Sequence, residues 1–219
     1  FPALRDPLVM ALAQIAVIWF FTYANILGPK IVGRMQGVTT TIALFPIIGV
    51  ALLGWFWFNP ETYMQGWNVS GESSLSAIGM TLNFTLWAFI GIEGAVVLSG
   101  RAKSQGDVGK ATIMGFLGGL IVFIMLSVLP FGVMSQQEIA SVANPSTAGV
   151  LEKVVGPWGA WLMNIGLLIS VLASWLAWTI ITAEMPFACA NDGTFPKFFA
   201  KSNASGSPST SLWITSALM

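Results

Sequence analysis

The residues with the most chemical potential lie in segment 87–94, which reads Trp-Ala-Phe-Ile-Gly-Ile-Glu-Gly. Glu93 is the only acid in the long apolar stretch around it, and Gly91 and Gly94 flank it. Glycine weakens a helix by about 1 kcal/mol relative to alanine, which favours an interruption of the helix at this point. Backbone carbonyls released near Ile90 and Gly91 would then accept hydrogen bonds from the ammonium group of a substrate.

A second interpretation of the two glycines stays open. Small residues let neighbouring helices approach closely in membrane bundles, so Gly91 and Gly94 would also suit a helix–helix contact. The spacing of the two glycines does not decide between a broken helix and a packing contact.

Glu93 needs a partner wherever it lies in the bilayer. An ionised carboxylate near the middle of the membrane costs on the order of 2.5 to 3.5 kcal/mol, so it must face water, find a hydrogen-bond donor or hold a proton. A carboxyl group that titrates near the working pH can carry a proton or couple conformation to pH. We favour this functional role for Glu93 over a purely structural acid bonded to a neighbouring helix.

Tryptophan supplies a second set of candidates. An indole face in a desolvated site can hold a cation with about 2 kcal/mol of binding energy. Trp87 and Trp178 are the two candidates, because most other tryptophans fall at the ends of apolar stretches, where aromatic residues gather at membrane interfaces. Packing in the core or at the interface is the alternative for each of them.

The elements that must position these residues are membrane-spanning helices. Hydrophobic residues make up 55% of the chain and charged residues 8%, whereas soluble domains carry about 25% charged residues. A helix needs about 20 apolar residues to cross the hydrocarbon, and charge-poor stretches of that length predict the spans. The predicted spans cover residues 8–27, 38–58, 75–100, 111–134, 158–190 and, incompletely, 212–219. We expect an all-α, polytopic membrane protein with a single transmembrane domain over residues 1–219, truncated at both ends.

The charges of the connecting segments predict the orientation. Lys and Arg in short loops favour the cytoplasmic side, and here they follow alternate spans. The basic residues on this side are Lys30, Arg34, Arg101, Lys103, Lys110, Lys197 and Lys201. Only Arg5 and Lys153 lie on the opposite side. The pattern predicts a multi-pass protein of the inner (plasma) membrane with the basic segments in the cytoplasm.

Three local patterns define helix ends. Ser135 followed by Glu138 reads as a capping box, in which each residue satisfies a backbone amide near the start of a helix. Residues 146–155 before Gly156 predict a short helix at the outer interface. The turn sequence Asn-Asp-Gly at 191–193, with Pro196 after it, predicts the end of the fifth helix.

Composition argues against several other classes of protein. Histidine is absent and Cys189 is the only cysteine, which removes His-based triads, Cys/His metal sites and intrachain disulfides. The net charge is +0 and no basic cluster alternates with aromatic residues, so a nucleic-acid partner is not expected. We expect no enzyme activity, no metal and no cofactor.

The chain resembles a known family of transporters. Segments 87–93 and 191–196 are similar to the basic amino acid/polyamine antiporters of the amino acid-polyamine-organocation superfamily. Further similar segments are 25–30, 54–58 and 67–69, so the resemblance extends over nearly the whole chain. The arginine/agmatine and putrescine/ornithine members typically carry a Lys-Asn-Pro-type loop after the third of these spans. This chain lacks that loop, and segments 94–102 and 156–160 instead resemble the arginine/ornithine exchangers.

The resemblance implies a leucine-transporter-like fold of two inverted five-helix repeats, of which this chain would supply about the fourth to ninth helices. It implies that the carbonyls of Trp87 and Ile90 receive the α-ammonium group of the substrate and that Trp87 helps to gate the site. It also implies that Trp178 stacks on the cationic head group, and Glu93 aligns with an acid implicated in pH response. The expected substrate-binding residues are Trp87, Ala88, Ile90, Gly91 and Trp178, with Glu93 for proton or pH coupling.

The expected function is exchange of arginine for ornithine by alternating access, without covalent chemistry. Lysine or a polyamine is the alternative substrate within the family. A channel or scaffold subunit of a membrane complex is the alternative from another class. The expected partners are cationic amino acids and the lipid bilayer, with a homodimer as a further option.

Overall fold

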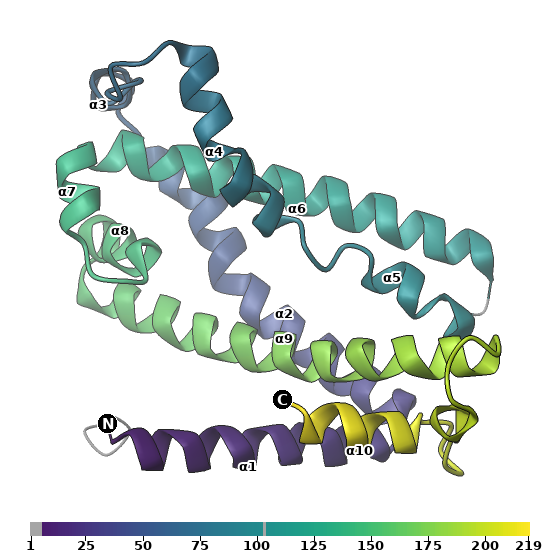
Figure 1. Cartoon of the computed structure of the whole chain (residues 1–219). Coiled ribbons are helices and arrows are strands. Elements are labelled where there is room, and N and C mark those ends of the chain that lie inside the picture. The colour runs from purple at the N-terminus through teal and green to yellow at the C-terminus, as the bar shows by residue number, and fades with distance from the viewer. Residues whose placement is uncertain (1–5, 103) are drawn as a thin grey trace. The chain divides into compact units, whose positions relative to one another are not determined.

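The computed structural model describes residues 6–102 and 104–219, and these residues are helical apart from their connections (Figure 1). Arg5 and Lys103, which entered the charge pattern above, lie outside the described residues. The helices are α1 (Pro7–Ile26), α2 (Pro29–Leu53), α3 (Pro60–Gln65), α4 (Ser74–Ala88), α5 (Gly94–Val97), α6 (Gln105–Val133), α7 (Gln136–Ser141), α8 (Ser146–Val155), α9 (Pro157–Asn191) and α10 (Ser209–Ala217). Three short 3-10 helices lie between these elements: η2 (Gly54–Trp57), η3 (Ser99–Arg101) and η4 (Lys197–Ala200).

Four helical stretches among the described residues are long and apolar enough to cross a membrane, judged by length and composition. They are Pro7–Ile26, Pro29–Trp57, Gly106–Val133 and Pro157–Asn191. The predicted span 75–100 is not one of them, because the chain stops being helical after Ala88 and divides this stretch between α4 and α5. The last predicted span, 212–219, falls on the short helix α10.

The start of α2 differs from the sequence-based expectation. Lys30 and Arg34, expected in a loop, lie in the first turns of α2. Pro29 opens the helix, where its fixed φ fits and its missing N–H is not needed. Gly28 before it has φ +128°, a conformation that side chains with a Cβ rarely adopt, and it turns the chain sharply from α1 into α2.

The chain divides into two compact units, Phe1–Thr41 with Ile169–Met219 and Ile42–Leu168. In the first unit, α1 and α10 pack against each other. Phe21 and Ala24 of α1 form a buried cluster with Val32 of α2 and Leu176 of α9. A buried hydroxyl pair, Thr22 and Ser216 with 2.6 Å between their oxygens, joins α1 to α10. Apolar packing and a satisfied polar contact together hold this unit.

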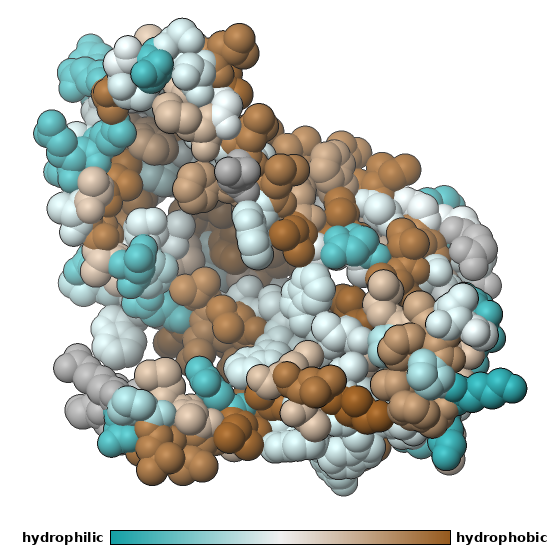
Figure 2. Space-filling model, viewed as in Figure 1, coloured by the Kyte–Doolittle hydropathy of each residue, from teal (hydrophilic) through white to brown (hydrophobic). Residues whose placement is uncertain are grey.

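The second unit has its own core, which α2, α6, α8 and α9 share. Its buried residues are Val50, Leu129, Ala148, Leu151 and Met163. The backbone N–H of Asn59 donates to the carbonyl of Gly132 at 2.8 Å, and this hydrogen bond connects the segment after η2 to the end of α6. Figure 2 shows brown apolar side chains over α6 and teal polar ones over α3 and α7. This distribution suits an apolar α6 with polar connecting helices at its end.

The predicted helix ends around α7, α8 and α9 are confirmed. Glu138 accepts from the Ser135 amide at 2.8 Å while the Ser135 hydroxyl accepts from the Glu138 amide at 3.3 Å, which completes the capping box. The short helix α8 covers Ser146–Val155. Helix α9 ends at Asn191, two residues before Gly193, whose φ of +77° is incompatible with further α-helix.

Candidate functional site

The segment after α4 is an interruption of the helix. Helix α4 ends at Ala88, residues 89–93 form turns, and α5 resumes at Gly94. Gly91 has φ +107°, outside the range that L-residues readily adopt. The helix is therefore broken here, as one interpretation of the glycines expected. Glycine suits position 91 because a residue with a Cβ rarely adopts this backbone conformation.

The interruption leaves backbone carbonyls without helical partners. In the described part of the chain, no backbone N–H donates to the carbonyl oxygen of Ala88 or of Ile90. The Trp87 carbonyl accepts a long turn bond from the amide of Ile90 at 3.3 Å and lies within reach of the Phe89 amide. The carbonyls of Trp87 and Ile90 were expected to be free. The Ile90 carbonyl lacks a backbone donor, whereas the Trp87 carbonyl accepts a long hydrogen bond. The Ala88 carbonyl is a further acceptor without a backbone donor.

Glu93 closes the turn that the glycine opens. One of its carboxylate oxygens, Oε2, accepts the N–H of Gly91 at 2.8 Å. Its hydrogen-bond partner is therefore a backbone amide two residues away. The carbonyl of Gly91 in turn accepts the N–H of Gly94 at 3.0 Å. A change in the charge of Glu93 would consequently act directly on the geometry of the interruption.

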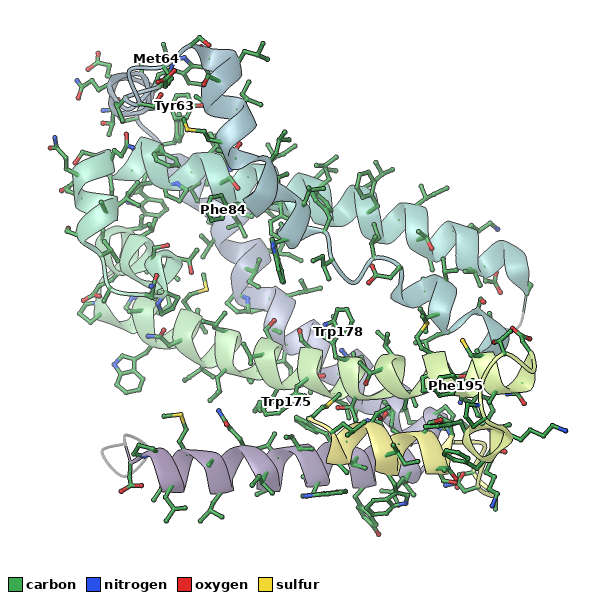
Figure 3. The ribbon with its side chains drawn as sticks, in the orientation of Figure 1. Tyr63, Met64, Phe84, Trp175, Trp178 and Phe195 are labelled. Carbon is green, nitrogen blue, oxygen red and sulfur yellow. The ribbon has the colours of Figure 1, made fainter. Side chains whose placement is uncertain are left out.

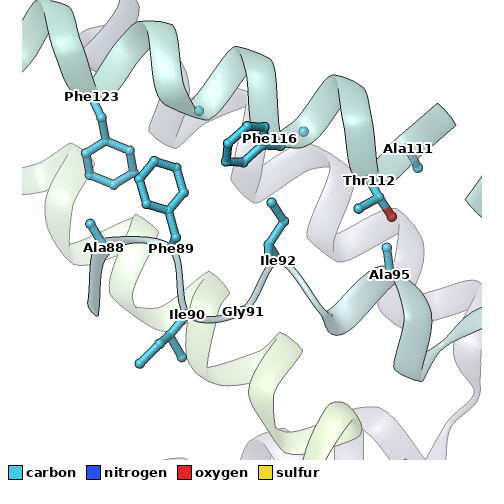
Figure 4. A pocket seen from close by; sticks show the side chains of 12 residues that line it. Ala88, Phe89, Ile90, Gly91, Ile92, Ala95, Ala111, Thr112, Phe116 and Phe123 are labelled. Carbon is cyan, nitrogen blue, oxygen red and sulfur yellow. The ribbon is translucent and has the colours of Figure 1, made fainter. Parts of the chain in front are cut away.

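Three phenylalanines that the sequence did not single out fix the interruption against α6. The ring of Phe89 lies between those of Phe116 and Phe123, with centroid distances of 5.4 Å and 5.7 Å (Figure 4). Tilted ring pairs at such distances are favourable beyond the area that they bury. The seven-residue spacing of Phe116 and Phe123, which places both on one face of α6, was the signal available in the sequence.

A cavity of about 340 Å³ opens between the interruption and α6. Small residues on α6 leave the room for it, and its wall is mainly apolar apart from backbone groups and Thr112 (Figure 4). The lining residues are Ala88, Phe89, Ile90, Gly91, Ile92, Ala95, Ala111, Thr112, Gly115, Phe116, Gly119 and Phe123. Three of the expected substrate-binding residues, Ala88, Ile90 and Gly91, thus lie at one cavity.

Neither tryptophan candidate is among the residues that line this cavity. Trp87 precedes the interruption with 75% of its surface exposed, and it is not among the residues that line the cavity. Trp178 lies in α9 within the first unit and is 36% exposed, so part of its indole is open to a ligand (Figure 3). Within residues 6–102 and 104–219, no group of three or more His, Cys, Asp or Glu could hold a metal ion.

The chain is similar to curated amino acid antiporters. The chain is 47% identical to an arginine/agmatine antiporter of Chlamydia felis and 49% identical to that of Chlamydia abortus, over 93% of its length in both cases. The antiporter of the same name from Chlamydia pneumoniae is 46% identical. The chain spans 43% to 44% of the length of these relatives. Their names do not support the arginine/ornithine branch that the segments 94–102 and 156–160 suggested.

The match to a family model is equally extensive. The model described as amino acid permease matches residues 4–219. This family consists of multi-pass membrane transporters and not of enzymes, which accords with the broken helix at 89–93 and the long apolar helices. The chain therefore belongs to the amino acid permease family of the amino acid-polyamine-organocation superfamily.

Proposed function

We propose that the intact protein is a secondary antiporter that exchanges arginine for agmatine by alternating access. The observation that carries this proposal is the helix interruption at residues 89–93, with acceptor carbonyls at Ala88 and Ile90. The names of the relatives support the substrate pair. Binding must favour one conformation over another, because only a difference in affinity shifts a conformational equilibrium.

The chemistry of the two substrates suits this set of residues. Arginine and agmatine share a guanidinium group at one end and an ammonium group at the other, and agmatine lacks only the carboxylate. The carbonyls of Ile90 and Ala88 bind the ammonium group, and Trp87 gates access to it. The family resemblance implies that the planar guanidinium stacks on the indole of Trp178, a geometry that the primary ammonium of ornithine does not reproduce.

Glu93 couples binding to protonation in this proposal. Its carboxylate holds the Gly91 amide, so protonation would weaken a charge-assisted hydrogen bond in the turn that presents the carbonyls. The affinity for the ammonium group would then depend on pH through the shape of the interruption.

Exchange in vesicles tests the substrate pair. The intact transporter in liposomes loaded with agmatine should take up labelled arginine, whereas vesicles without a counter-substrate should take up almost none. Uptake into ornithine-loaded but not agmatine-loaded vesicles would refute the substrate pair, as would uptake driven only by lysine or putrescine. Net current without any counter-substrate would instead identify a channel.

A substitution tests the role of Trp178. Loss of a stacked cation worth about 2 kcal/mol lowers affinity roughly 30-fold, so Trp178→Leu should weaken arginine binding by about that factor. Trp161→Leu is the matched control, because Trp161 lies on the same helix with 71% of its surface exposed. Unchanged arginine affinity in Trp178→Leu would remove this residue from the site.

A further inference from the structure

Basic side chains of the first unit lie near the connection from α1 to α2 and in the segment between α9 and α10. Lys30 and Arg34 of α2 and Lys197 and Lys201 of the segment before α10 are all exposed. Asp192 is the exposed acid of this region, so the balance is strongly positive. The antiport mechanism proposed above uses none of these residues.

A hydrogen-bonded clasp fixes the chain that carries Lys201. The Asn25 carbonyl at the end of α1 has no helical donor, because Pro29 lacks an N–H, and the Ser207 hydroxyl donates to it at 2.6 Å. The side-chain amide of Asn203 donates to the carbonyl of Ile26 at 2.8 Å. Two otherwise unpaired carbonyls of α1 are therefore capped by the segment before α10.

The same segment lies against the start of α2. A Cβ atom built on Gly28 would approach the Cβ of Ser205 to 3.1 Å, so the two backbones are in close contact. The Asn203 carboxamide oxygen also accepts the amides of Ser205 and Ser207 at 3.0 Å and 2.9 Å, which makes the loop rigid. The clasp thus places the segment that carries Lys201 beside the start of α2, which carries Lys30.

Two exposed aromatic rings stand beside these charges. Phe195 and Phe198 are 43% and 47% exposed, and both rings contact that of the half-buried Phe199, at 4.9 Å and 4.4 Å (Figure 3). The carbonyl of Phe199 accepts the Ser211 hydroxyl at 3.2 Å, which anchors the aromatic group to α10. The surface therefore combines fixed apolar rings with cationic side chains.

We propose that this surface, made of Lys30, Arg34, Lys197, Lys201, Phe195 and Phe198, binds the headgroups of anionic phospholipids in the cytoplasmic leaflet. It lies at the ends of long apolar helices, where headgroups meet the protein. Basic residues attract anionic lipids, and aromatic rings enter the boundary between headgroups and acyl chains. A soluble anion would explain the charges but not the exposed phenylalanines.

Lipid competition tests the proposal. Native mass spectrometry of the intact transporter with an equal mixture of phosphatidylglycerol and phosphatidylcholine should show preferential retention of phosphatidylglycerol, and the preference should weaken at high salt. Each charge contributes about fivefold in lipid affinity, so the double variant Lys197→Gln/Lys201→Gln should lower the preference by more than tenfold. Phe198→Ala should reduce retention of both lipids.

Lys153→Gln is the matched control. It removes one exposed positive charge from α8 in the second unit, outside the proposed surface, and should leave the preference for phosphatidylglycerol unchanged. An unchanged preference in the double variant, with a normal gel-filtration profile, would overturn the proposal. An equal loss in Lys153→Gln would overturn it too, because net charge and not this surface would then set the preference.

Discussion

Gly91→Ala is the substitution that the geometry of the interruption singles out. Gly91 has φ +107°, and its N–H and C=O groups both bond within the turn, to Glu93 and Gly94. A residue with a Cβ held in such a conformation costs about 1–3 kcal/mol. The variant must either carry this strain or rewind the turn toward a regular helix.

Both responses have measurable consequences. Retained strain of about 2 kcal/mol lowers the thermal stability of the intact transporter. A rewound turn gives the carbonyls of Ala88 and Ile90 backbone donors, so they no longer bind the ammonium group. Arginine affinity then falls by up to about 30-fold, which corresponds to about 2 kcal/mol of binding free energy. Thermal unfolding and arginine titration by calorimetry, on the same preparation, measure the two effects.

Gly118→Ala provides the comparison. Gly118 lies in α6, outside the lining of the cavity, and a Cβ added there meets nothing within 4 Å. Alanine in an open helical position should stabilise the protein by about 0.4–1 kcal/mol and leave arginine affinity alone. If Gly91→Ala behaves like Gly118→Ala, the strained turn is not a feature of the molecule and the reasoning from its geometry fails.

Three further perturbations test other contacts. Asn203→Ala leaves the Ile26 carbonyl at the end of α1 without its donor and should destabilise the intact protein by about 1–3 kcal/mol in thermal unfolding. Hydrogen bonds from Lys153 and from the amide and hydroxyl of Ser135 lower the pKa of Glu138 from 4.5 to about 2, so the contribution of this carboxylate is complete above pH 4.5 and is lost as the pH falls toward 2. Hydrogen exchange of α7 should report this loss, with Lys153→Met moving its onset to higher pH. Phe89→Ala removes a half-buried ring and should cost about 2 kcal/mol, whereas Phe84→Ala, at a position 79% exposed, should cost little in the same assay.

Local sequence chemistry predicted several helix ends and offered the interruption as one of two interpretations. Gly91 and Gly94 around a lone acid were consistent with a break or with a packing contact, and the structure shows the break, while the capping box at Ser135 and Glu138 has the expected hydrogen bonds. These features depend on residues a few positions apart, whose conformational preferences act within one turn of chain. A single sequence is therefore enough to find them.

Features that depend on distant residues were missed. The contact of Phe89 with α6 joins positions 27 and 34 residues further along the chain, and the seven-residue spacing of Phe116 and Phe123 does not by itself show which ring packs between them. The early start of α2 was missed because Lys30 and Arg34 lower hydropathy without preventing helix formation. The ornithine branch was inferred from short segments, and the names of relatives matched over 93% of the chain do not support it.

The central claim is that residues 89–93 present backbone oxygens to a cationic substrate. The most direct measurement is the structure of the intact transporter with arginine bound. The α-ammonium nitrogen should lie about 3 Å from a carbonyl oxygen of Ile90, Ala88 or Trp87, with the turn at Gly91 still open. A continuous helix from α4 into α5, with arginine bound away from these oxygens, would contradict the account.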